Sequence, residues 1–465
     1  MAKSPTSAFV VVANRLPVDR VTTRRGSQWR RSPGGLVTAL EPVLREHDGI
    51  WVGWPGAKLD RYSAFEAEGL TLAPVELSDA EVRSYYEGMS NATLWPLYHD
   101  LVAKPEFHRD WWVSYVDVNR RFAALAARYA APGAEVWVHD YQLQLVPAML
   151  RELRPDLRIG FFLHIPFPPS ELFAQLPWRV GILEGMLGAD IVGFQRPAAA
   201  ANFARLVRQL LGQKTHRDLI MLDDGRQVLA RSYPISIDFA DLERLATSPG
   251  VAARADQVRQ ELGDPPNVLL GVDRLDYTKG IVQRLRAFGE LIVDGRIERD
   301  DAVFVQVASP SRERVEQYRA VRNDIERWVG RINGDLGRIG RPVVHYLHSS
   351  YPREEMAALF TAADVMVVTP FADGMNLVAK EYVTCRYRNT GALVLSEFTG
   401  AADELRQAFL VNPYDINGLK SAMYTAIRAD PRDLSRRMRA LRRQVRDHDI
   451  WAWARRFLSD LGAPA

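Results

Sequence analysis

The sequence predicts an α/β protein with two domains, each built on a doubly wound parallel sheet. Short apolar runs of strand length alternate with longer amphipathic stretches, the order that βαβ units produce. These runs form two groups on either side of a polar, charge-mixed stretch at residues 238–264. A chain of 465 residues has room for about two to three domains. We therefore expect helices on both faces of each sheet, and a ligand cleft at the carboxyl ends of the strands.

The apolar runs are expected to be buried parallel strands. In the first group they are Phe9–Ala13, Val136–Val138, Ile159–Leu163 and Ile191–Phe194, and in the second Val268–Val272, Val303–Val307, Val365–Val368 and Leu393–Leu395. The amphipathic stretches expected to be helices include Ile281–Ile292, Arg312–Ile332, Ala379–Tyr387 and Trp451–Leu461. The expected domains are residues 1–238 and 239–446, followed by a terminal helix within 447–465.

Composition and charge exclude several classes of protein. Hydrophobic residues make up 47% and charged residues 25%, a balance typical of globular proteins. The net charge of +3 is small, and its signs are interspersed, which argues against nucleic-acid binding. The single cysteine, Cys385, excludes an internal disulfide and a cysteine-based metal site. With no apolar run long enough for a membrane span or a signal peptide, we expect a cytoplasmic protein without a membrane partner.

Polar residues directly follow six of the expected strands. They are Asn14–Arg15, His139–Asp140, His164, Arg274 with Lys279, Ser309–Arg312 and Asp373–Leu377. Doubly wound folds bind their ligands where parallel strands end. Six such placements in one chain are hard to assign to chance, so we predict a ligand site at these strand ends.

The segment Gly271–Gly280 has the chemistry of a diphosphate site. Arg274 and Lys279 place two cations before a helix N-terminus, where amide dipoles also favour an anion. The alternative is that both side chains form ordinary ion pairs with Asp273 and Asp276. No carboxylate pair spaced as Asp-x-Asp lies beside this segment, so we expect no metal cofactor.

The segment Asp373–Glu381 opens a second helix after a strand. Gly374 allows close backbone approach, and the first amides of the helix can hold an anion. Glu381 lies on the same helix face as Leu377 and could accept two ribose hydroxyls. The alternative is an N-capping Asp373 with a solvated Glu381.

Further candidates have weaker signals. Gly34 and Gly35 precede a helix and let amides approach a phosphate or sugar, although most such pairs mark turns. The arginine-rich run Asp19–Pro33 reads as a mobile lid or as a solvated loop. His164 ends a strand before prolines, which favours a site residue over a core histidine. The aromatic faces of Trp54, Tyr86 and Trp95 suit a sugar, with core packing as the alternative for each.

Taken together, six motifs closely resemble the trehalose-6-phosphate synthase family of glycosyltransferases, over about Phe9 to Leu461. The motifs are Ala13–Pro17, Ser90–Pro96, His139–Leu143, Gly160–Pro168, Arg274–Gly280 and Asp373–Glu381. The resemblance implies a GT-B fold, in which two Rossmann-like domains face a central cleft and the last helix crosses back to the first domain. The N-terminal domain would bind the acceptor and the C-terminal domain the nucleotide sugar.

The resemblance also implies the reaction. Glucose would pass with retention from a nucleotide diphosphate glucose to glucose 6-phosphate, giving α,α-trehalose 6-phosphate and a nucleoside diphosphate. UDP-glucose is the family default, while GDP-glucose and ADP-glucose stay open as donors. We expect metal-independent activity, small-molecule substrates and a homodimer or homotetramer. No phosphatase domain follows before Ala465, so we expect the phosphate ester as the product.

The family's roles transfer to matching positions of this chain. Arg15, Tyr86 and Arg312 would bind the acceptor phosphate, with Trp54, Trp95 and Asp140 beside the acceptor sugar. The donor would contact Gly34, Gly35, His164, Arg274, Lys279, Tyr351, Asp373, Gly374, Met375, Asn376, Leu377, Val378 and Glu381. Of these, His164, Asp140, Arg274, Lys279 and Asp373 would surround the reacting atoms.

Two departures from the family pattern stand out. Ala372 occupies a position where many relatives carry arginine, and the run Asp19–Pro33 is longer and more basic than in short bacterial relatives. Two other functions share this scaffold: a pseudo-glycosyltransferase that couples amino-cyclitol phosphates, and a non-catalytic regulatory subunit that binds sugar phosphates. Every acceptor and donor position that can be compared suits the synthase rather than the pseudo-glycosyltransferase. The intact Arg274, Lys279, Asp373 and Glu381 argue against the regulatory subunit.

Overall fold

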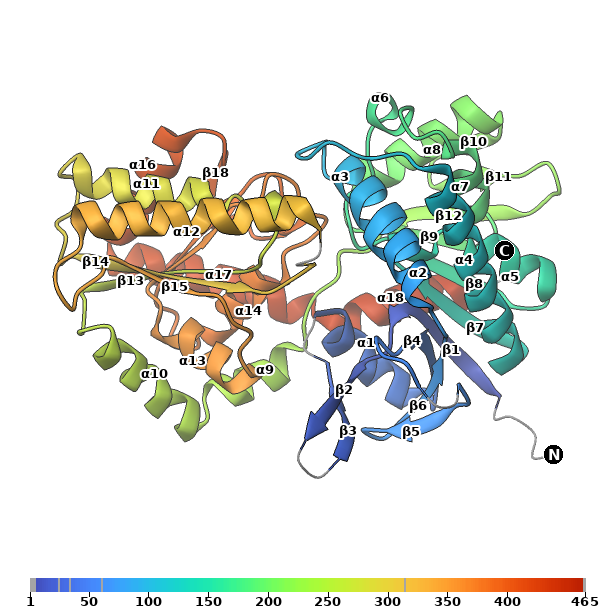
Figure 1. Ribbon diagram of the computed structural model, residues 1–465, viewed down its shortest axis with the longest axis horizontal. Helices are drawn as coiled ribbons and strands as arrows, with labels where there is room; N and C mark the ends of the chain where they lie inside the picture. Colours follow the sequence, from blue (N-terminus) through green and yellow to red (C-terminus); the bar gives the residue numbers. More distant parts are fainter. Residues whose placement is uncertain (1–5, 24–25, 33–34, 60–61, 313–314, 463–465) are drawn as a thin grey trace. The chain divides into compact units, whose positions relative to one another are not determined.

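The computed structural model describes residues 6–23, 26–32, 35–59, 62–312 and 315–462 (Figure 1). The chain divides into two compact units, one formed by Met1–Ile235 with Trp451–Ala465 and the other by Ser236–Ile450. These divisions fall a few residues from the boundaries placed after residues 238 and 446. Across the described ranges, no helix combines the length and apolarity that a membrane span needs.

Unit 1 is built on one large sheet. Its strands, in spatial order, are β10 (Lys214–His216), β11 (Leu219–Met221), β12 (Gln227–Ser232), β9 (Ile191–Phe194), β8 (Arg158–Phe162), β7 (Ala130–His139), β1 (Ser7–Arg15), β4 (Ile50–Trp54), β6 (Leu70–Pro74) and β5 (Phe65–Ala67). Neighbours from β12 to β6 pair in parallel, and only the edges are antiparallel. The central strands are buried along almost their whole length, as expected of a sheet covered on both faces.

Helices of unit 1 connect these strands. They are α1 (Gly35–Glu46), α2 (Asp79–Glu81), α3 (Trp95–Tyr98), α4 (Arg109–Tyr129), α5 (Val146–Leu153), α6 (Ser170–Phe173), α7 (Arg179–Met186), α8 (Pro197–Leu211), the π-helix η1 (Val82–Leu94) and the 3-10 turn η2 (Tyr141–Leu143). A π-helix of this length is unusual, because single-turn bulges are the common form and are often found at functional sites.

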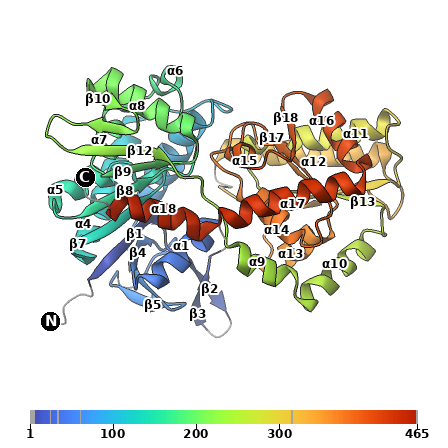
Figure 2. The same ribbon diagram turned by 180° about the vertical axis from the view of Figure 1, so that it is seen from behind.

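The terminal helix α18 (Ile450–Gly462) packs on the large sheet of unit 1 (Figure 2). Phe457 stacks on Trp137 of β7 with ring centroids 4.4 Å apart, and Trp453 stacks on the same ring at 4.8 Å. A Cβ on Gly160 or Gly193 would lie within 2.8 Å of the Phe457 ring, so these glycines make room for the helix. The expected aromatic helix at Trp451–Leu461 is therefore confirmed and belongs to unit 1.

Unit 2 contains a six-stranded, all-parallel sheet. Its spatial order is β15 (Val344–Leu347), β14 (Ala302–Ser309), β13 (Asn267–Arg274), β16 (Val365–Val368), β17 (Ala392–Ser396) and β18 (Phe409–Val411). Its helices are α9 (Phe239–Ala246), α10 (Pro249–Glu261), η3 (Tyr277–Lys279), α11 (Ile281–Val293), α12 (Glu316–Leu336), α13 (Arg353–Ala362), α14 (Leu377–Cys385), α15 (Gly400–Glu404), α16 (Ile416–Arg428) and α17 (Pro431–Asp447).

Strand order fixes where each unit can bind a ligand. In chain order the strands of unit 2 run 3-2-1-4-5-6, the Rossmann arrangement, and the order reverses between β13 and β16. In unit 1 the corresponding reversal lies between β7 and β1. Ligands bind outside the carboxyl ends of the strands at such switch points. The residues after these four strands are therefore the first place to look for a site.

All eight expected strands are present, but two other expectations need correction. The helix expected from Arg312 begins only at Glu316, and Arg312 itself has a left-handed φ of 48°. The run Asp19–Pro33, expected as a lid or loop, contains an antiparallel hairpin of β2 (Val18–Thr23) and β3 (Gly26–Arg31). The Val, Thr and Trp residues have high strand propensity and favour strand pairing in this run despite its many arginines.

Candidate active site

In unit 1, neighbouring strand ends bring Asp140 and His164 together. Asp140 follows β7, and His164 lies two residues beyond β8. The Asp140 Oδ1 atom accepts a hydrogen bond from the His164 backbone N–H at 3.1 Å. Asp140 has a φ of 77°, a left-handed conformation that is strained for a residue other than glycine. Such strain is concentrated at functional sites, which supports a site at this switch point.

Arg15, at the end of β1, lies beside Trp54, and Trp54 lies beside Tyr86, so three predicted acceptor residues are neighbours. Its guanidinium carbon lies 4.9 Å from the centroid of the Trp54 ring, and Trp54 lies 5.9 Å from the Tyr86 ring. Arg15 also pairs with Asp19 at 2.6 Å, with the Arg15 side chain 41% exposed. A half-exposed cation stacked on an aromatic face is suited to binding an anionic ligand.

The π-helix η1 connects this group to Trp95. The Asn91 side chain donates to the backbone oxygen of Tyr86 at 2.8 Å and accepts from the Tyr141 hydroxyl at 2.8 Å. The Tyr141 ring in turn packs 5.6 Å from Trp95. Because Tyr141 directly follows Asp140, the hydrogen bonds of Asn91 hold the predicted acceptor residues of unit 1 in one connected group.

His164 is joined to a second, fully buried histidine. The His139 Nδ1 and His164 Nε2 atoms lie 3.0 Å apart. Burial lowers the pKa of His164 to about 3, and burial together with the His164 ring lowers the pKa of His139 well below its usual value. Both imidazoles are therefore neutral at pH 7, and His164 can form hydrogen bonds to a substrate without carrying a charge.

The glycine pair predicted for the donor is only partly visible. Gly34 lies outside the described residues, and Gly35 is the first residue of α1. The role of these glycines stays a prediction.

In unit 2, the two switch-point strands bring Lys279 and Asp373 into contact. The Lys279 Nζ and Asp373 Oδ2 atoms lie 2.8 Å apart, with the two side chains 10% and 14% exposed. Asn376 also donates to Asp373, at 3.2 Å. The helix cap of α14 is Asn376, which accepts from the Ala379 amide at 2.9 Å, so the alternative of an N-capping Asp373 is wrong.

Asp276 interacts with three cations near this contact: Arg312, Lys279 and Arg274. It accepts hydrogen bonds from the Tyr318 hydroxyl at 3.1 Å and from Arg312 at 3.4 Å. Burial alone would raise the pKa of Asp276, but Arg312, Lys279 and Arg274 outweigh it and hold the pKa below its usual value. Lys279 thus lies between the carboxylates of Asp276 and Asp373, and Arg274 and Arg312 act on Asp276 as well, so this edge of unit 2 is rich in cations that an anionic ligand could meet.

The remaining donor candidates lie along the same edge of unit 2. Glu381 is partly buried on α14, and burial raises its pKa, opposed by Arg353. Tyr351 lies between β15 and α13. Gly374, Met375, Leu377 and Val378 form the turn and the first residues of α14, where helix geometry leaves amides without intrahelical acceptors.

Sequence reasoning missed the buried residues that support these side chains. Arg284 is fully buried and pairs with Asp273 at 2.7 Å, so Asp273 is not the partner of Lys279. Arg284 also donates to the Lys279 backbone oxygen at 2.7 Å. It occupies a helix of ordinary amphipathic pattern, where an arginine gives no sign of being buried. His139 was visible as a strand-end residue but had no assigned role.

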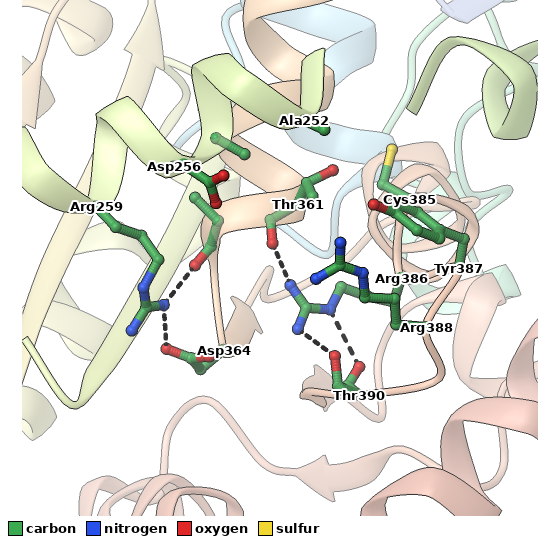
Figure 3. A pocket seen from close by; sticks show the side chains of 12 residues that line it. Ala252, Asp256, Arg259, Thr361, Asp364, Cys385, Arg386, Tyr387, Arg388 and Thr390 are labelled. Atoms are coloured by element: carbon green, nitrogen blue, oxygen red, sulfur yellow. Dashed lines mark hydrogen bonds and ion pairs between the residues drawn. The ribbon is translucent and has the colours of Figure 1, made fainter. Parts of the chain in front are cut away.

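Two cavities of unit 2 are lined by other residues. One of about 160 Å³ is lined by Arg259, Asp364, Arg386 and Thr390 among others, and none of the predicted site residues lines it (Figure 3). Several of its polar groups are paired with one another: Arg259 bonds to Asp364 at 2.8 Å, and Arg386 bonds to Thr390. We therefore place the candidate site at the strand ends instead.

Metal ligands do not accumulate around the candidate residues. Within the parts of the chain that the structure describes, no three His, Cys, Asp or Glu side chains are grouped so that they could hold a metal ion. The positive charge next to Asp373 comes from Lys279, and Arg274 and Arg312 act on the neighbouring Asp276.

Comparison with known proteins identifies the family. The sequence matches the model of glycosyltransferase family 20 over residues 7–463. It is 58% identical to the trehalose-6-phosphate synthase of Mycolicibacterium gilvum over 480 residues, covering 99% of this chain and 95% of the relative. It is also similar to two solved structures, each with a TM-score of 0.90 and 32% identity over 98% of this chain.

The first of these structures is the Burkholderia xenovorans alpha,alpha-trehalose-phosphate synthase (UDP-forming) in complex with glucose-6-phosphate, and this chain covers 100% of it. The second, from E. coli, is bound with UDP-2-fluoro glucose, and this chain covers 99% of it. This likeness confirms the predicted fold class, with its two Rossmann-like domains. The chain belongs to glycosyltransferase family 20, and the prediction that it is a glycosyltransferase is confirmed.

Proposed function

We propose that this enzyme transfers glucose from a nucleoside diphosphate glucose to glucose 6-phosphate, giving α,α-trehalose 6-phosphate. The observation that carries the proposal is the contact of Lys279 with Asp373 at the switch point of unit 2. One donor molecule presents a diphosphate for the cation and sugar hydroxyls for the carboxylate. Unit 1 supplies the chemistry for the acceptor, with Arg15 for its phosphate and Trp54 for its sugar ring.

The relatives support both substrates. The Burkholderia xenovorans protein was solved with glucose-6-phosphate and the E. coli protein with UDP-2-fluoro glucose. The default donor is UDP-glucose. The base would meet mainly backbone around Leu347–Tyr351, which gives the side chains little influence over its identity, so GDP-glucose and ADP-glucose are the competing donors.

A turnover assay tests the function. Purified enzyme is given glucose 6-phosphate with UDP-, GDP- or ADP-glucose, and nucleoside diphosphate release is followed together with the disaccharide phosphate. The proposal expects turnover, fastest with UDP-glucose. Turnover only with an amino-cyclitol phosphate would identify a pseudo-glycosyltransferase, and binding without any turnover would identify a regulatory subunit.

Removing either acceptor cation should weaken the use of glucose 6-phosphate. Charge-assisted hydrogen bonds contribute about 1.5–3 kcal/mol each, so Arg15→Ala and Arg312→Ala should each lower kcat/KM for the acceptor by roughly ten- to a few hundredfold. Steady-state kinetics with saturating donor measures this. The exposed Arg205→Ala on α8 is the matched control and should change little. Unchanged acceptor kinetics in both site variants would contradict the assignment.

Turnover should not need a divalent metal. Positive charge from Lys279 and Arg274, together with the N-terminus of α14, faces the place assigned to the diphosphate. We expect the same rate in excess chelator as in added Mg²⁺. A rate that falls in chelator and returns with Mg²⁺ or Mn²⁺ would refute this.

Retention of configuration is proposed to occur without a covalent intermediate. A double displacement needs a free carboxylate nucleophile. Asp140 and Asp373 are the two carboxylates to consider, and the family resemblance assigns Asp140 to the acceptor and Asp373 to the glucose hydroxyls, so neither is free to attack. We propose front-face attack, in which the leaving diphosphate takes the proton of the acceptor hydroxyl.

Mass spectrometry with a slow fluorinated donor tests this mechanism. Intact protein is expected to show no added sugar in the wild type or in Asp140→Ala. A glucosyl adduct on Asp140 or Asp373 would replace front-face attack by a double displacement and leave the overall reaction unchanged.

A further inference from the structure

The buried histidine pair of unit 1 has one ring nitrogen that no group satisfies. His139 is completely buried at the end of β7, and its Nδ1 lies 3.0 Å from the Nε2 of His164. Within the described part of the chain, the buried His139 Nε2 has no hydrogen-bond partner. The ring is enclosed by Trp137, with centroids 4.8 Å apart, and by Phe162 at 6.4 Å.

The aromatic rings around His139 restrict the position of its imidazole ring. Trp137 is itself covered by Trp453 and Phe457 of α18, so His139 cannot swing away from His164 without disturbing a stack of large rings. The nearest titratable group that acts on His139 is His164 itself. Two neutral rings therefore share a single proton along the bond between them.

Either His139 or His164 can carry the proton of the hydrogen bond between them. The two arrangements differ in what they leave at the buried Nε2 atom of His139. If His164 donates, the single proton of His139 lies on Nε2 as a buried N–H without an acceptor. If His139 donates from Nδ1, its Nε2 is a bare lone pair. Buried N–H groups without a partner are rarer in proteins than unsatisfied acceptors, so the second arrangement is favoured.

We propose that His139 is a positioning residue that donates from Nδ1 to His164 Nε2 and so turns a protonated Nδ1 of His164 toward the donor sugar. A hydrogen bond at one ring nitrogen of a histidine commonly fixes which tautomer the ring adopts and which way its other nitrogen points. Here His139 would fix the His164 ring through its Nε2 atom. His164 then offers a hydrogen-bond donor to a sugar hydroxyl. The inference rests on the proposed placement of His164 beside the donor glucose.

The protonation states can be read directly. Full-length protein labelled with ¹⁵N-histidine is analysed by long-range ¹H–¹⁵N correlation, with signals assigned from the His139→Asn and His164→Asn variants. We expect His139 and His164 both protonated at Nδ1 in the free enzyme. A proton on His139 Nε2 would overturn the proposal, and this outcome does not depend on what reaction the enzyme performs.

Two substitutions of His139 separate positioning from packing. His139→Asn keeps a donor N–H near the Nδ1 position, whereas His139→Leu fills the space without one. We expect His139→Leu to lower kcat/KM for the nucleotide glucose about tenfold, as the loss of one hydrogen bond implies, and His139→Asn to recover most of it. Inhibition by the free nucleoside diphosphate, which lacks the sugar, should be unchanged in both.

Two results would contradict a positioning role for His139. Equal losses in the two variants, or a parallel loss of nucleoside diphosphate binding, would show that His139 only fills space and would overturn the proposal. Thermal melting of each variant checks that unit 1 is folded. If the wild type turns over none of the three nucleotide glucoses, the proposed function fails, and the spectrum still decides where the protons lie.

Discussion

Replacing Lys279 with alanine should reduce kcat by about 100- to 1000-fold, equivalent to about 2.7–4 kcal/mol of transition-state stabilisation. The Lys279 ammonium is nearly buried and lies 2.8 Å from Asp373. Negative charge grows on the leaving diphosphate as the glycosidic bond breaks, so a cation facing it acts more strongly on the transition state than on the bound donor. KM for the donor should therefore change much less than kcat.

Lys420 provides a matched control for this prediction. It too is a mostly buried lysine of unit 2 and pairs with two carboxylates, Asp294 at 2.7 Å and Glu290 at 3.1 Å. It lies on α16, whose residues include none of the predicted site. Lys420→Ala should leave kcat within about twofold of the wild type, because its charge faces no ligand. A similar loss of kcat in the two variants would mean that Lys279 acts through the fold.

Steady-state rates with both substrates varied give the two constants separately. If Lys279→Ala raises KM for the donor and leaves kcat unchanged, Lys279 binds the donor equally well in the ground state and in the transition state. That result would contradict a specific role in the transition state.

The strand ends of both units could be predicted from the sequence because the signal is local. An apolar run such as Val268–Val272 must be buried, and a cation such as Arg274 directly after it must lie at the edge of the sheet. The same logic placed Asp140 and His164, whose strands are neighbours in the sheet. Residues that directly follow neighbouring parallel strands therefore meet at the same edge of the sheet, and their positions can be predicted from the sequence pattern.

Pairing between side chains could not be predicted in the same way. The sequence offers Lys279 two nearby aspartates, Asp273 and Asp276, but its ammonium group contacts Asp373, which lies 94 residues away. The choice depends on strand order, because β13 and β16 become neighbours only when the sheet folds. Asp273 instead lies against Arg284, whose burial depends on the packing of α11.

Substituting Arg284 should cause the largest loss of stability among the residues of unit 2 considered above. Its guanidinium makes four hydrogen bonds: to Asp273 at 2.7 Å, to the backbone oxygens of Lys279 at 2.7 Å and Val367 at 3.0 Å, and to the Thr369 hydroxyl at 2.8 Å. The Arg284 side chain is 0% exposed and that of Asp273 2%. The group joins the ends of β13 and β16 to the turn that carries Lys279.

Arg284→Met should therefore lower the free energy of unfolding of unit 2 by about 3–5 kcal/mol, because it leaves the Asp273 carboxylate buried without its partner. Arg286→Ala, two residues along the same helix, removes an exposed ion pair with Glu290 and should cost less than about 0.5 kcal/mol. The double variant Arg284→Met with Asp273→Asn should recover part of the loss, since no buried charge remains.

Hydrogen exchange followed by mass spectrometry in increasing urea resolves unit 2 from unit 1, which a single unfolding curve of the whole chain would not. Peptides from β13 and β16 should lose protection first in Arg284→Met, and peptides from β7 and β8 should be unaffected. Because Arg284 holds the Lys279 turn, kcat should fall in the same variant even in the absence of urea. Full protection of β13 and β16 in Arg284→Met would show that the buried pair contributes little to the stability of unit 2.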